Sequence, residues 1–248
     1  MLYINKNHPP ISVQDEINRV KRTSGWREAN APEQIRDCFD QLDKSIIREA
    51  LIREQHSLCA YCMRKINNGG NSMTIEHRIP LSRDKENALN FSNMLGVCDG
   101  GSSGTNSRYL CCDRAKGDTP ITLDPTRHEM MECIFYRDKG KEIYYKGNDN
   151  ALSDTINREI NRTLLLNGAH NRDGSFRSDT ATKIVKGRSD AYKCYLKIIN
   201  EATTKGHLDA TYLRSQIRNI TESDEYPEYA GVILFYLRRK LRTMENNR

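Results

Sequence analysis

The sequence predicts a mainly α-helical protein that carries a small α+β core stabilised by zinc. Two observations predict this fold class. Apolar residues recur at helical spacing over residues 32–55 and over most of the chain after residue 148. Between these parts the sequence is rich in loops and holds cysteines at the spacing that zinc sites use. We therefore expect three regions: an N-terminal arm with helices and a candidate partner contact (1–55), a metal-bound core with a hairpin (56–148) and a C-terminal helical region (149–248).

In the N-terminal region we expect irregular structure over the first thirty residues and then a helix that begins near Pro32. Proline suits the first turn of a helix, because the N–H that it lacks has no partner there. The apolar positions that follow indicate helical structure as far as His56, with a break near Asp43. They are Ile35, Cys38, Phe39, Leu42, Ile46, Ile47, Ala50 and Leu51.

The central region alternates turns with short strands. Residues 68–71 (Asn-Gly-Gly-Asn) indicate a turn, and residues 73–77 alternate like a strand. Residues 99–106 are rich in glycine and serine, which indicates a flexible excursion. Residues 133–136 and 142–145 flank an Asp-Lys-Gly sequence and predict a β-hairpin.

The remainder of the chain is predicted to form four helices, because its apolar residues form four stripes at helical spacing. The stripes are Leu152, Ile156, Ile160 and Leu164; Ile184, Ala191, Tyr195 and Ile199; Tyr212, Leu213 and Ile217; and Val232, Phe235, Tyr236 and Leu241.

Charge and hydropathy restrict the environment and the partner. The formal net charge of +6 and the pI near 8.8 suit a polyanionic partner without proving one. No apolar run is long enough to span a membrane, and the N-terminus lacks the apolar core of a signal peptide. We therefore expect a cytoplasmic protein with no membrane partner.

Eight cysteines in such a chain favour metal ligation over a disulfide framework. Cys59-x-x-Cys62 has the knuckle spacing that lets two thiolates reach one tetrahedral zinc. A redox pair is the alternative, but the βαβ context that it needs is missing. The other two ligands are expected to be Cys98 and either Cys111 or Cys112, and the alternative is four free thiols. Three cysteines are interpreted as small buried hydrophobic residues: Cys38, Cys133 and Cys194.

The dipeptide Glu76-His77 suits the chemistry of phosphodiester hydrolysis. That reaction needs a base that activates water and a metal ion that stabilises charge on the phosphoryl and leaving oxygens. A neutral imidazole can be the base near pH 7, while the adjacent carboxylate ligates the ion. Asp113 offers a second hard oxygen, as Mg²⁺ or Mn²⁺ prefers. Taken singly, Glu76-His77 is also compatible with two exposed surface residues that have no function. Asp113 is also compatible with the N-cap of a helix that begins at Arg114.

Together these residues resemble the HNH endonuclease family. The family pattern is C-x-x-C, then Asp/Glu-His-x-x-Pro, then Asn-Leu, then C-x-x-C followed by His, Asn or Asp and x-x-Lys. The chain shows these parts in order as Cys59-x-x-Cys62, Glu76-His77-x-x-Pro80, Asn93-Met94-Leu95, Cys98 and Cys112-Asp113-x-x-Lys116. The resemblance implies a ββα-metal core held by structural zinc.

The resemblance also implies a role for each matching position. His77 falls on the general base, and Glu76 and Asp113 fall on the ligands of a catalytic Mg²⁺ or Mn²⁺. Asn93 is implied to brace the loop that orients the histidine. Lys116 is implied to approach a phosphate, and its alternative is a solvated helix residue.

The chain departs from the family pattern in two places. Thirteen residues separate Cys98 from Cys112 instead of two, and Met94 stands between the asparagine and the leucine. The first departure leaves the fourth zinc ligand open. Cys112 is preferred because it precedes Asp113 as the motif requires, with Cys111 in reserve.

Three details of the pattern, Cys59-Ala-Tyr-Cys-Met-Arg64, Val97-Cys-Asp-Gly-Gly101 and the delayed Cys112-Asp-x-x-Lys-Gly117, are similar to the PtuB-type HNH nucleases of Septu and of some retron antiphage systems. This narrower resemblance implies the effector of an antiphage defence complex. It implies an ABC-like ATPase of the PtuA type as partner. In retrons it also implies a reverse transcriptase with its RNA–DNA hybrid.

Two classes of function stay open from the sequence. The first is a metal-dependent endonuclease that cuts DNA, the default of the HNH resemblance, or structured RNA such as tRNA. The second is a non-catalytic, zinc-stabilised adaptor that binds nucleic acid or protein. Basic residues around Trp26 and at Arg238-Arg239-Lys240-x-Arg242 suit a phosphate-binding face or a protein interface.

Overall fold

The structure of the protein, a computed structural model, describes residues 1–69, 72–101, 110–168 and 179–246. It is mainly helical and contains two small antiparallel sheets, which confirms the coarse fold class that the sequence predicts. Within these ranges, none of the helices has the length and apolar character that crossing a membrane requires.

Four helices form the N-terminal region: α1 (Ile11–Lys21), α2 (Ser24–Glu28), α3 (Pro32–Asp40) and α4 (Lys44–Glu54). The prediction of irregular structure over the first thirty residues is wrong, because α1 and α2 lie there. Helix α1 buries Val13, Ile17 and Val20 on one face, and the polar residues between them obscure this short stripe. The Thr23 hydroxyl caps α2 by accepting a hydrogen bond from the Trp26 N–H.

The predicted helix start at Pro32 and the break near Asp43 are both confirmed. Pro32 lies in the first turn of α3. The Asp43 carboxylate accepts a hydrogen bond from the Ser45 N–H and so caps α4. The buried face of α3, which includes Phe39, packs against the short helix α5 (Lys85–Ala88).

The central region contains β1 (Met73–His77), the 3-10 turn η1 (Phe91–Asn93), β2 (Met94–Cys98) and α6 (Cys112–Lys116). Strand β1 lies where the sequence predicts it and pairs antiparallel with β2, so that Glu76 lies opposite Leu95 and His77 opposite Met94. Helix α6 contacts β2 and begins at Cys112, so Asp113 is not the cap of a helix that starts at Arg114. The predicted turn and excursion fall in part on residues 70–71 and 102–109, which lie outside the described residues.

The predicted hairpin is confirmed. After α7 (His128–Glu132), the strands β3 (Ile134–Arg137) and β4 (Glu142–Tyr145) pair antiparallel. Asp138, Lys139 and Gly140 in the turn all have positive φ. A Cβ at Gly140 would lie 2.8 Å from the Arg188 carbonyl oxygen, so this position requires glycine both for its φ and for its space.

The C-terminal region is helical, as predicted from the four stripes. It contains α8 (Asn150–Arg158), the π-helical turn η3 (Glu159–Thr163), α9 (Asp179–Thr204), α10 (Ala210–Thr221) and α11 (Ala230–Asn246). The buried guanidinium of Arg188 joins α9 to the hairpin and to the segment after η3, because it donates to the carbonyl oxygens of Gly140 and Leu166.

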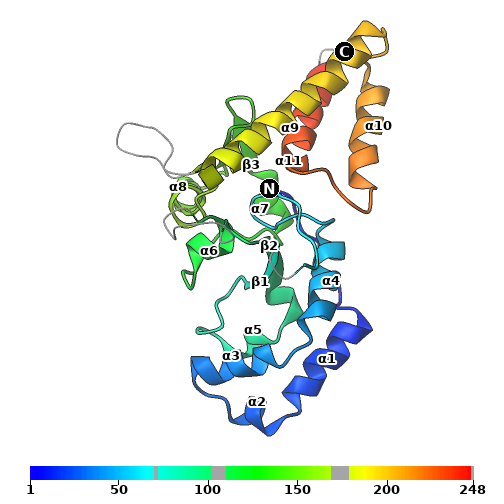
Figure 1. The fold of residues 1–248 in the computed structure, drawn as a ribbon. Helices are drawn as coiled ribbons and strands as arrows, with labels where there is room; N and C mark the ends of the chain where they lie inside the picture. Colours follow the sequence, from blue (N-terminus) through cyan, green and yellow to red (C-terminus); the bar gives the residue numbers. More distant parts are fainter. Residues whose placement is uncertain (70–71, 102–109, 169–178, 247–248) are drawn as a thin grey trace.

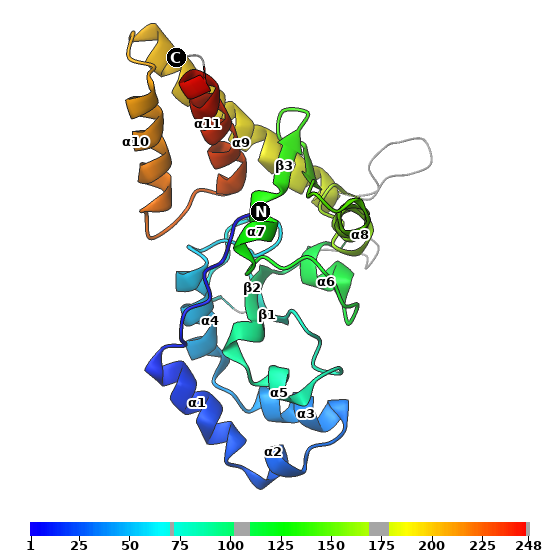
Figure 2. The same ribbon diagram turned by 180° about the vertical axis from the view of Figure 1, so that it is seen from behind.

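The elements are arranged along an elongated molecule. Helices α1, α2, α3 and α5 gather at one end, α9, α10 and α11 lie at the other, and β1 and β2 lie between them (Figures 1 and 2). One buried hydrophobic cluster nevertheless includes residues of all three predicted regions. The Tyr229 N–H, just before α11, donates to the Met63 carbonyl oxygen and so joins the C-terminal region to the cysteine-bearing loop.

Candidate metal centre and acidic cleft

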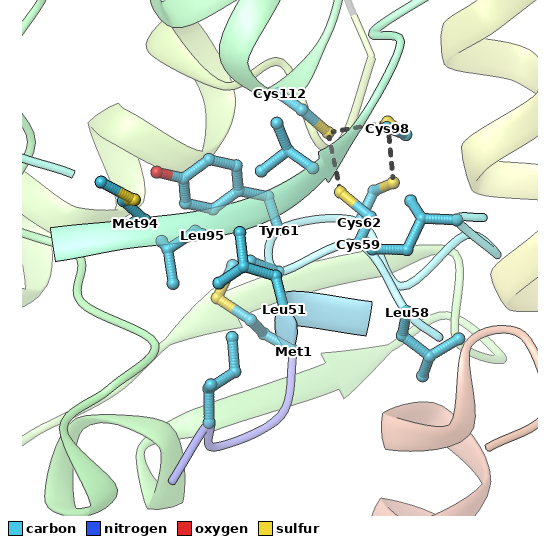
Figure 3. Packing of buried hydrophobic residues seen from close by; sticks show 14 of the residues in the cluster. Met1, Leu51, Leu58, Cys59, Tyr61, Cys62, Met94, Leu95, Cys98 and Cys112 are labelled. Carbon is cyan, nitrogen blue, oxygen red and sulfur yellow. Dashed lines mark hydrogen bonds between the residues drawn. The ribbon is translucent and has the colours of Figure 1, made fainter. Parts of the chain in front are cut away.

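Four buried cysteines come together from three parts of the central region. Cys59 and Cys62 lie in the loop after α4, Cys98 ends β2, and Cys112 begins α6. Their Sγ atoms all lie within 4.8 Å of one another, and Figure 3 shows them converging beside the buried core. These four cysteines could therefore hold a metal ion such as zinc.

The spacing of the sulfur atoms fits a tetrahedral thiolate site. Zinc–sulfur bonds of about 2.3 Å give a tetrahedron whose sulfur–sulfur edges are about 3.8 Å. The Sγ–Sγ distances are 3.9 Å between Cys59 and Cys112, 3.6 Å between Cys62 and Cys98, and 3.7 Å between Cys98 and Cys112. These three pairs of sulfur atoms therefore lie at the separations that one zinc ion would impose.

Of the two candidates in the split second knuckle, Cys112 belongs to the group of four, while its neighbour Cys111 does not. Cys111 is also buried, and its thiol lies 3.8 Å from Nη2 of Arg64. The same nitrogen donates to Cys98 Sγ at 2.9 Å. Arg64 therefore places a positive charge beside a site whose four thiolates would outweigh the charge of a zinc ion.

The three remaining cysteines differ in exposure. Cys38 is buried, which confirms the prediction for this residue, whereas Cys133 is only partly buried. Cys194 is exposed, so the prediction that it is buried is wrong. Cys194 lies on α9 but is not one of the stripe residues, which belong to the core or pack against it.

A second polar cluster surrounds Glu76 on β1. Glu76 Oε1 accepts a hydrogen bond from the Tyr61 hydroxyl at 3.2 Å and forms an ion pair with Lys116 Nζ at 2.8 Å. Asp113, in the first turn of α6, lines the same cleft as Glu76 and raises the pKa of that carboxyl group. The structure therefore places the two carboxylates that the sequence singles out in one cleft, although 36 residues separate them in the chain.

Opposing effects act on Glu76. Burial raises its pKa, and the neighbouring carboxylate of Asp113 raises it further, while the Lys116 ammonium lowers it. The net result is a pKa of about 8, so burial and the second carboxylate outweigh the lysine. A cation bound by both carboxylates would favour the ionised form of Glu76, and this donor set of two hard oxygens fits Mg²⁺ or Mn²⁺.

Lys116 is 2% exposed, so the alternative of a solvated helix residue is wrong. Besides Glu76, its ammonium contacts the carbonyl oxygen of Gly117 at 3.1 Å. Both contacts hold it inside the protein. Its approach to a phosphate stays a prediction.

His77 lies next to this cluster and is also buried. Its Nε2 is 3.0 Å from the Ala88 carbonyl oxygen, and its ring meets the Phe39 ring edge-on with centroids 4.6 Å apart. Since a carbonyl only accepts, the Nε2 atom carries the ring proton and Nδ1 keeps its lone pair. Burial, to which the Arg36 charge adds, lowers the pKa of His77 to about 4, so the imidazole is neutral at pH 7.

Asn93 braces the loop that carries the partner of His77. Its side-chain oxygen accepts from the Ile79 N–H at 2.8 Å, and its amide group donates to the carbonyl oxygens of Ile79 and Asn87, each at 3.0 Å. Ala88, whose carbonyl contacts His77, directly follows Asn87. The geometry agrees with the orienting role that the motif implies.

Asn93→Ala should therefore destabilise the protein by about 2–4 kcal/mol, because three partly buried backbone groups lose their partner. Thermal or urea unfolding measures this loss. Asn90→Ala is the matched control: Asn90 is exposed and caps η1 through the Ser92 N–H, so its replacement should cost only about 1 kcal/mol. Equal losses in the two variants would contradict the bracing role.

The carboxylates and the histidine line one cleft of about 300 Å³. Its walls come from α3, β1, the loop after β1, and α6 with the residues that follow it. The lining residues are Arg36, Phe39, Thr74, Ile75, Glu76, His77, Pro80, Leu81, Asp113, Arg114, Lys116, Gly117 and Asp118. The cleft is thus open to a ligand and is built around the predicted catalytic residues.

The two basic clusters named from the sequence lie outside this cleft. Trp26 is buried, with the Lys85 ammonium over its ring at 5.1 Å. On α11, Arg238 and Arg242 are exposed at the rim of a separate pocket.

No family model matches the chain, and none of the curated proteins matches it.

Three residues of the site were not assigned a role from the sequence. Tyr61 and Arg64 lie within the Cys59–Arg64 stretch that carries the family resemblance, so their proximity to the cysteines was the available signal. Arg36 had no signal, because its nearness to His77 arises only from the packing of α3 over β1 and α5.

Proposed function

We propose that the protein is a metal-dependent endonuclease of the HNH type that hydrolyses phosphodiester bonds of nucleic acid, with DNA as the favoured substrate and tRNA or other RNA as the alternative. One observation carries the proposal. A buried neutral histidine, oriented by a backbone carbonyl, shares a cleft with two carboxylates, one of which raises the pKa of the other. This is the set of groups that phosphodiester hydrolysis needs.

In the proposed reaction His77 is the general base. Its Nε2–H donates to the Ala88 carbonyl, so Nδ1 takes the proton of a water molecule as the water oxygen forms a bond to phosphorus. The bond from phosphorus to the leaving oxygen breaks, and that oxygen takes a proton from solvent. Asn93 keeps the Ala88 loop in place and so keeps the ring in position.

Glu76 and Asp113 would hold the catalytic ion, Mg²⁺ or Mn²⁺. When bound, such an ion stabilises negative charge on the phosphoryl and leaving oxygens. Tyr61 and Lys116 contact Glu76 from within the protein and fix its position. The four cysteines would hold zinc in a structural role, since a site closed by four thiolates leaves no position for water.

The test is cleavage of supercoiled plasmid DNA and of tRNA by the purified protein with Mg²⁺ or Mn²⁺. Cleavage should stop on addition of EDTA and return when excess Mg²⁺ is restored, while the zinc content, measured on the same samples, stays constant. Nucleic-acid binding without cleavage under every one of these conditions would favour the non-catalytic adaptor and contradict the proposed function.

On the family resemblance alone, we further propose that the nuclease acts as effector of an antiphage complex with a PtuA-type ATPase, and in a retron with the reverse transcriptase and its RNA–DNA hybrid. Co-purification from the native operon tests this proposal. Recovery of the protein without an ATPase would contradict it and would leave the nuclease chemistry to be judged by the cleavage assay.

A further inference from the structure

Arg36 is an exposed arginine in the wall of the acidic cleft. It comes from α3, outside the segment that carries the motif. Within the described residues its side chain has no hydrogen-bond or ion-pair partner. Other arginines of the same arm are engaged: Arg19 binds Glu16, and Arg27 donates to the Arg22 carbonyl oxygen. Arg36 therefore presents a free guanidinium to the cleft.

The packing of α3 fixes where this guanidinium lies. Phe39 follows Arg36 by three residues, so both side chains are on one side of the helix. The Phe39 ring contacts the His77 ring, with centroids 4.6 Å apart. Arg36 is thus held one helical turn from a residue that touches the proposed general base.

The charges of the cleft leave a need for an exposed cation. Asp118 is exposed in the wall, and Asp113 adds negative charge as long as no cation is bound, so both would repel a polyanion. Lys116, the lysine of the motif, is buried against Glu76 at 2.8 Å and is not free to meet a phosphate from solvent. The other exposed arginine of the wall, Arg114, directly follows Asp113 on α6.

We propose that Arg36 binds a backbone phosphate of the nucleic-acid substrate beside the scissile bond and so takes the phosphate-contacting part that the motif implies for Lys116. The inference rests on the proposed function and assigns the N-terminal arm to the substrate site. A guanidinium offers two parallel N–H donors to a phosphate, which lysine does not. The contact would position the substrate without reading its sequence.

The test measures binding of a short fluorescent DNA duplex at increasing salt, with His77→Ala as background so that the duplex stays intact. Adding Arg36→Ala should weaken binding about tenfold at low salt, the effect of one charge-assisted contact. It should also reduce the slope of log affinity against log salt by about 1. Arg36→Lys should keep the slope and recover only part of the affinity.

Arg22→Ala is the matched control, because Arg22 is an exposed arginine of the same arm that does not line the cleft. It should change affinity by less than about twofold. With His77 intact, Arg36→Ala should raise KM for DNA cleavage more than it lowers kcat, and unchanged melting temperatures should show that the variants are folded.

Equal affinities and salt slopes for Arg36→Ala and Arg22→Ala would overturn the assignment of Arg36 while leaving the nuclease intact. Failure of the unsubstituted protein to cleave DNA or tRNA with Mg²⁺ or Mn²⁺ would instead remove the proposed function, and the role of Arg36 would fall with it. The two failures are therefore distinguished by the cleavage assay on the unsubstituted protein.

Discussion

Replacing Cys112 by serine should remove the metal from the protein and unfold its centre, whereas replacing the adjacent Cys111 should do neither. The Cys112 thiol lies 3.9 Å from Cys59 and 3.7 Å from Cys98, at the edges of the thiol tetrahedron. Zinc bound by such sites contributes about 10–16 kcal/mol to the folding of small zinc domains near pH 7. Loss of one ligand should therefore cost on the order of several kcal/mol.

The same measurements on Cys111→Ser provide the control. Both residues are buried, but the Cys111 thiol contacts Arg64 and lies outside the group of four. A serine hydroxyl can accept from the same guanidinium, so the expected cost is about 1 kcal/mol. Zinc content by mass spectrometry and unfolding in urea measure the two effects. A Cys111 variant that loses zinc as fully as the Cys112 variant would refute the assignment.

The helices and the hairpin could be predicted because their signals are local. The apolar residues from Leu152 to Leu164 lie in or next to the helical segment that they predict, and the Asp-Lys-Gly sequence forms the hairpin turn itself. Helix α1 was missed because its short stripe is interrupted by charged residues. A stripe of three apolar residues carries little signal until other helices bury it.

The site could be predicted in part, and the missing part depends on contacts between distant segments. The residue types of Glu76, His77 and Asp113 are visible in the sequence, but the burial of Lys116 is not. A lysine at the end of a short helix is usually solvated. Here the buried carboxylate of Glu76, far away in the chain, holds the ammonium inside. The position of Arg36 is likewise set by the packing of α3, which no spacing rule within the motif encodes.

His77→Ala should reduce cleavage by about 10²–10⁴-fold while leaving zinc content and fold unchanged, because it removes the only group assigned to activate water. The substitution also leaves the Ala88 carbonyl without its partner and opens space beside Phe39. His77→Gln is therefore a second variant: its amide can still donate to Ala88, but it cannot take up a proton near pH 7.

Single-turnover cleavage of plasmid DNA measures the effect, and His128→Ala is the matched control. His128 is exposed, lies outside the cleft and contacts the Tyr3 ring edge-on, so its loss should leave the rate unchanged. If both His77 variants are folded and cut at the rate of the His128 variant, His77 is not the base. If only the alanine variant is slow, the ring has a structural role, since glutamine would have restored the contact with Ala88 and with it the rate.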